Sequence, residues 1–119
     1  MLTTPAFLPA ASLQPSALAL EQMIGEIAAD AAAALARALR EFQTDGLSFE
    51  AKMRVGDLIA RLFELRLCAG QIDFYAVARV RGIRLLQKRY GEDLNARMIA
   101  ALIDAVLEIL QQILHAELN

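Results

Sequence analysis

The chain holds few side chains that could carry out catalysis. Its single histidine, His115, and its single cysteine, Cys68, are the candidates for a general base and a nucleophile. Such a pair must lie within hydrogen-bond reach, and no feature of the sequence brings the two together, because Cys68 ends an apolar helical run and His115 lies close to residue 119. We therefore expect Cys68 to be a buried structural thiol, and we expect no catalytic residue.

Metal and phosphate chemistry have no better candidates. A di-metal site in a helical bundle requires two Glu-x-x-His pairs, whereas Gln112 stands three residues before His115 and no second histidine exists. The six glycines are isolated and form no phosphate-binding loop or dinucleotide fingerprint. Asp104 and Glu108 lie one helical turn apart, as on a solvated face. We predict a protein that is not an enzyme and binds no metal or cofactor.

Positive charge is concentrated between residues 74 and 91, where five basic residues occur without an acid. Arg81, Arg84 and Lys88 recur at helical spacing and could form a basic strip for an acidic partner or a nucleic-acid backbone. The alternative is neutralisation by acids of the neighbouring helices, and we favour it because charge runs on helices are usually solvated faces. The candidate acids are Glu21, Glu26, Asp30, Glu41, Asp104 and Glu108.

Composition sets the scale of the molecule. The chain has 119 residues, of which 57% are hydrophobic and 22% charged, and its net charge is -2. This suits one domain, and the apolar excess predicts that some surface is buried between chains, as in a homodimer. A lone cysteine, no recognisable secretory signal and no uncharged apolar run of about 18 residues favour a cytoplasmic protein that does not associate with membranes.

Apolar residues recur with helical periodicity along most of the chain. The pattern predicts an all-α fold with helices over residues 17–43, 49–68, 73–90 and 93–117. Ser48 and Asp73 are expected to cap helices, and Gly46, Gly70 and Gly91 to end them. Short loops favour a four-helix antiparallel bundle, or an irregular helical bundle. We expect one domain over residues 17–119, preceded by an irregular arm, residues 1–16, that contains all three prolines.

Two of the predicted helices are apolar over more of their circumference than one small core requires. We therefore predict a homodimer seam, or a groove for a partner helix, on the second and fourth helices. The alternative is that the fourth helix is the central helix of a monomer. The residues assigned to this partner interface are Leu58, Leu62, Leu102, Ile103, Val106, Leu107, Leu110, Ile113 and Leu114.

These patterns favour a small protein–protein interaction module, a regulator or adaptor that binds and masks another protein, such as an anti-activator or a chaperone. The partner is not identified by the sequence. One alternative is a nucleic-acid-associated protein that uses the basic third helix. Another is a bundle that binds a small ligand in a pocket lined by Phe49, Met53, Phe63 and Met98.

Overall fold

The computed structural model describes residues 16–44 and 49–118, and within them every element is a helix. The helices are α2 (Ala17–Thr44), α3 (Phe49–Cys68), α4 (Phe74–Tyr90) and α5 (Ala96–Leu118). The predicted all-α class is confirmed, and the expected bounds agree with the observed ones to within a few residues. The proline-containing arm and the Ser48 cap lie outside the described residues.

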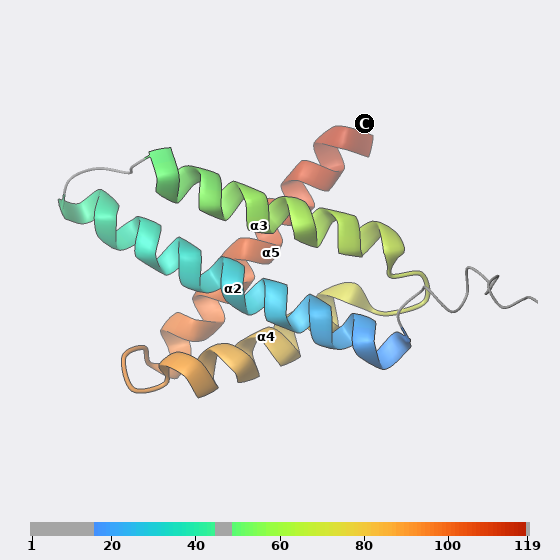
Figure 1. The fold of residues 1–119 in the computed structure, drawn as a ribbon, viewed down its shortest axis with the longest axis horizontal. Coiled ribbons are helices and arrows are strands. Elements are labelled where there is room, and N and C mark those ends of the chain that lie inside the picture. Colours follow the sequence, from blue (N-terminus) through green and yellow to red (C-terminus); the bar gives the residue numbers. More distant parts are fainter. Residues whose placement is uncertain (1–15, 45–48, 119) are drawn as a thin grey trace, which may run out of the picture.

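The helices form an irregular bundle (Figure 1). α2 and α3 run antiparallel side by side, while α5 crosses behind both of them on a diagonal. α4 packs on α2 on the side away from α3. Both α2 and α5 contact the other three helices. α2 and α5 are therefore the two central helices, and α3 forms one edge of the molecule.

Side-chain caps define the helix starts. The Ala19 amide donates to Ser16 Oγ at 3.1 Å, and the Ala76 amide donates to Asp73 Oδ1 at 3.3 Å. The predicted Asp73 cap is thus confirmed. The Met98 amide donates to Asn95 Oδ1 at 2.9 Å, so α5 begins after Asn95 rather than near Asp93. A polar oxygen at this position satisfies an amide that has no partner within the helix.

The contact between α2 and α4 is built from small residues. A Cβ atom added at Gly82 would stand 3.0 Å from Ile103 Cδ1 and 3.3 Å from Ala28 Cβ, and one added at Gly25 would stand 2.5 Å from Arg81 Cβ. Ala28 is fully buried. Gly82 therefore permits close packing of the helices, because no larger residue fits this crossing without displacing its neighbours.

The core is apolar throughout the described residues, with no buried polar or charged side chain among them. α5 supplies much of it. By length and composition alone, its segment from Ala96 to Glu117 could also cross a membrane. That segment carries Asp104 and Glu108 on exposed positions, however, and its other face is packed against the chain's own helices. This combination is typical of the core helix of a bundle. The buried residues of α5 are Ile99, Leu102, Ile103, Val106, Leu107, Leu110 and Leu114.

Candidate interaction surface

The residues predicted for the partner interface lie mainly inside the chain's own core. Eight of the nine are buried by neighbouring helices, and only Ile113 is exposed. A second chain could reach the others only if the helices separated. The excess of apolar residues on α5 is explained by its position across three helices, so the alternative of a central helix in a monomer accounts for this stripe. The eight buried residues are Leu58, Leu62, Leu102, Ile103, Val106, Leu107, Leu110 and Leu114.

The basic third helix is largely neutralised within the chain. Arg79 Nε donates to Asp104 Oδ1 at 2.8 Å, and Arg89 donates to Asp30 at 2.7 Å. The hydrogen bond to Asp104 and the charge of that carboxylate raise the pKa of Arg79 above its usual value. These pairs are half-exposed, so each contributes little to stability, but each directs an arginine toward the body of the protein.

Internal ion pairing also involves one of the three residues of the candidate basic strip. Arg81 pairs with Glu21 at 3.1 Å across the α2–α4 contact, where both side chains are partly buried. Arg84 and Lys88 are exposed. Internal pairing, which we favoured from the sequence, is therefore confirmed for Arg81, as it is for Arg79 and Arg89, and the strip as a free surface shrinks to Arg84 and Lys88.

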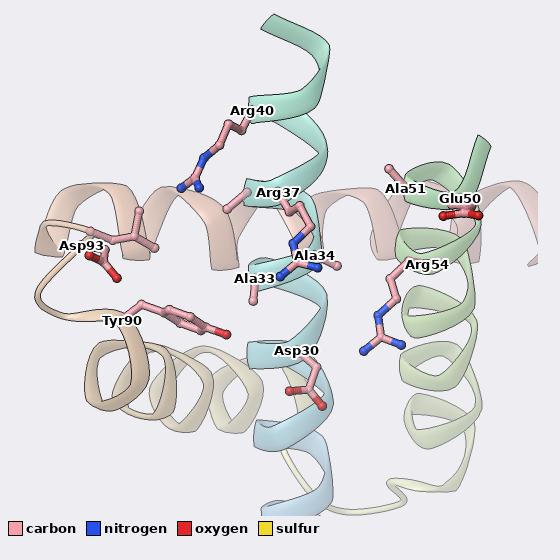
Figure 2. Close-up of a pocket in the computed structure, with 12 residues that line it drawn as sticks. Asp30, Ala33, Ala34, Arg37, Arg40, Glu50, Ala51, Arg54, Tyr90 and Asp93 are labelled. Carbon is pink, nitrogen blue, oxygen red and sulfur yellow. The ribbon is translucent and has the colours of Figure 1, made fainter. Parts of the chain in front are cut away.

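A groove of about 450 Å³ lies between α2, the beginning of α3 and the end of α4. Figure 2 shows Arg37, Arg40 and Arg54 around a floor of α2 alanines, with Tyr90 at one side. Acids line the same groove, because Asp30, Glu50 and Asp93 also belong to its wall. The opposite charges balance, and the groove therefore has no net preference for an anion.

The residues named for the small-ligand alternative do not line the groove. Phe49, Met53 and Met98 are exposed, and Phe63 is half-buried. The groove described above contains none of the four.

Cys68 was expected to be buried, but this was wrong: it is the last residue of α3 and is exposed. His115 is exposed on α5.

Large exposed apolar side chains occur on all four helices, and three of them lie on one face of α3. Phe49 is 75% exposed, Met53 48% and Leu67 63%, and between them Gly56 and Ala60 are exposed and Phe63 is half-buried. We call this set the α3 stripe. Its intervals along the chain are 4, 3, 4, 3 and 4 residues, which keep all members on one side of a helix. Its members are Phe49, Met53, Gly56, Ala60, Phe63 and Leu67.

Most of the α3 stripe lies away from the face that anchors α3 to the protein, although Phe63 also packs against the core. Leu58, Ile59 and Leu62 are the buried residues of the helix. At about 100° per residue, Leu58 and Leu62 lie on the side away from the stripe, whereas Ile59 lies beside it. The periodicity did not reveal that Gly56 and Ala60 complete the row, because small residues contribute little to an apolar pattern.

Within residues 16–44 and 49–118, no group of three or more His, Cys, Asp and Glu side chains is placed to hold a metal ion. Comparisons of the chain with protein-family models, curated proteins and solved structures found no match. The geometry of the α3 stripe is therefore the main guide to what the protein does.

Proposed function

We propose that this protein is a small helical interaction module that acts by binding another protein chain through the α3 stripe. The supporting observation is that Phe49, Met53 and Leu67 are exposed on one face of a helix whose opposite side is already packed in the core. Transfer of a side chain such as Phe or Leu from water into an interface contributes about 1.5–3 kcal/mol. A row of several such residues is unusual on a surface that faces only water.

The mode of binding follows from the spacing. A single helical face with anchors every three or four residues fits a second helix, either in a groove or in a two-helix seam. Such a contact suits a regulator or adaptor that masks a helix of its partner. This proposal retains the function class expected from the sequence and moves the contact from the buried side of α3 to the exposed side.

The test compares two methionines of matched exposure. Met53 belongs to the α3 stripe and Met98 lies on α5, with exposed fractions of 48% and 46%. We expect Met53→Asp to reduce capture of a protein partner by tagged full-length chain at least tenfold, because a buried unpaired charge disrupts an apolar interface. Met98→Asp serves as the control and should capture normally.

Circular dichroism of both variants establishes that each one is folded. Equal capture by the Met53→Asp variant and the unaltered chain would refute the proposal. Leu107→Asp and Leu110→Asp would not test the proposal, because both residues are buried in the chain's own core and a charge there would unfold it.

A further inference from the structure

The α3 stripe contains a glycine that the packing of the described residues does not require. A Cβ atom added at Gly56 would meet nothing within 4 Å, and the residue lies in the interior of α3. Glycine in a helix interior is less favourable than alanine, so no contact among the described residues explains its presence here. Ala60 follows one turn later on the same face. Because Gly56 and Ala60 are both small, no bulky side chain stands in the middle of the stripe, and another helix backbone can approach closely there.

Charged residues flank the stripe in an ordered way. On one side Glu50, Asp57 and Glu64 are spaced seven residues apart, so they form an acidic column beside it. The corresponding positions on the other side are Lys52, Ile59 and Arg66. Ile59 is buried in the core, and the Arg66 guanidinium lies over the Tyr75 ring, 5.7 Å from its centroid. Lys52 is therefore the exposed basic residue of this flank.

We infer that the occupant of the α3 stripe is the α3 helix of a second copy of this chain, paired in parallel. This inference rests on the proposed function and names its partner. In a parallel pair, the acidic flank of each helix faces the flank of the other helix that carries Lys52. Residues five apart in the sequence then meet across the seam. Lys52 of each copy then meets Asp57 of the other, twice by symmetry.

Charge distinguishes the parallel arrangement from the antiparallel one. In an antiparallel pair the two acidic columns lie on the same side of the seam, so that Asp57 faces acids of the second copy. The parallel arrangement removes this repulsion and places Gly56 and Ala60 of both copies at the same level of the seam. The bodies of the two copies lie on opposite sides, because Leu58 and Leu62 anchor each α3 by the side away from its stripe.

The first experiment exchanges the charges of the inferred pair in the full-length chain. Self-association is measured by sedimentation equilibrium for the Lys52→Glu and Asp57→Lys variants. Each variant alone should dimerise about tenfold more weakly than the unaltered chain, because each homodimer contains two repulsive pairs. An equimolar mixture of the two variants should regain the affinity, since both pairs are then attractive.

The outcomes are distinct. A monomeric unaltered chain at millimolar concentration would overturn the inference. Tighter dimerisation of the Asp57→Lys variant would overturn the parallel arrangement, because removal of an acid helps only where acids face each other. No change in either variant would overturn the Lys52–Asp57 contact. If the unaltered chain is monomeric while Met53→Asp still abolishes capture of a different protein, the inference fails and the proposed function stands.

A cross-linking experiment identifies the occupant directly. Cys68 is exposed, so the full-length chain carries Cys68→Ser together with Ala60→Cys. Under mild oxidation the parallel pair should form a disulfide-linked dimer, because residue 60 of one copy lies opposite residue 60 of the other. Ala101→Cys, at an exposed alanine of α5, is the matched control and should remain uncrosslinked.

Three other results would contradict the inference. Disulfide formation only between an Ala60→Cys chain and a Gly56→Cys chain would indicate antiparallel helices. A mixed disulfide with a different protein in lysate, without any homodimer, would indicate a heterologous partner. A residue 60 thiol that resists alkylation in a monomer would indicate that residues 1–15 of the same chain cover the stripe.

Discussion

Gly56 and Gly82 are both glycines in the interior of a helix, yet their surroundings differ completely. Gly82 is enclosed by Ile103 and Ala28, whereas Gly56 faces open space. A side chain added at position 82 would therefore collide with neighbouring residues, whereas one added at position 56 would not. Periodicity gives no indication of this difference, because it depends on what the neighbouring helix places opposite each position.

We expect Gly82→Leu to lower the free energy of unfolding by about 1–3 kcal/mol or more, because the added side chain overpacks the α2–α4–α5 contact. Gly56→Ala should raise it by up to about 1 kcal/mol, because alanine is the better helix former and nothing obstructs its Cβ. Urea denaturation at low protein concentration measures both changes. Equal effects of the two substitutions would show that the α2–α4 crossing is looser than described.

At the scale of the helix, α3 has two apolar faces with different roles. Leu62 is fully buried while Leu67 is 63% exposed, although the same residue type occupies the same helix five positions apart. The sequence showed both faces but not which of them the protein covers. The sequence favoured burial of both faces, because apolar periodicity indicates that a face is shielded from water but not which chain packs against it.

Leucine-to-alanine substitution should separate the two faces. We expect Leu62→Ala to cost about 2–5 kcal/mol of the free energy of unfolding, because it leaves a cavity in the core. Leu67→Ala should change that quantity by less than about 0.5 kcal/mol in a dilute monomer. Chemical denaturation gives both values. A large loss for Leu67→Ala under those conditions would mean that its side chain is covered within the chain.

Helix positions were the most predictable part of the structure. Apolar periodicity located the four helices, and Asp73 was recognised as a cap because an Asp before an apolar run satisfies a helix-start amide. The start of α5 was placed too early, since Asp93 and Asn95 are both good caps and only the turn on the Tyr90 carbonyl selects Asn95. The exposure of Cys68 was missed for a related reason: it depends on where α3 leaves the core.

At the scale of the whole molecule, an antiparallel or an irregular helical bundle was expected, and the structure is an irregular one in which α5 crosses behind α2 and α3 on a diagonal (Figure 1). Crossing angles depend on how side chains of different helices interlock, which no single helix encodes alone. This geometry explains the wide apolar face of α5 without a second chain. It also removes most of the candidate interface residues from the surface and leaves the α3 stripe in their place.

The full-length chain should not insert into lipid bilayers. α5 is apolar enough by composition to span one, but insertion would expose Asp104 and Glu108 to hydrocarbon and would remove the core residues of α5 from the bundle. Acidic residues near the centre of a span are costly, by about 2.5–3.5 kcal/mol for Asp. In vesicle flotation we expect the chain to remain in the aqueous fraction. Flotation with the vesicles that persists at high salt would contradict the assignment of α5 as a core helix.

The narrow attachment of α3 has a consequence for motion. Three side chains, Leu58, Ile59 and Leu62, are the buried residues of that helix, whereas the α2–α4 crossing joins backbones almost directly. Local opening generally begins where the fewest apolar contacts are lost, so the helix that presents the stripe is also the one that detaches with the least disruption. In the unbound chain, the amide hydrogens of α3 should therefore exchange with solvent faster than those of α2. A partner bound to the stripe should slow the exchange of the α3 amides, because α3 then opens less often.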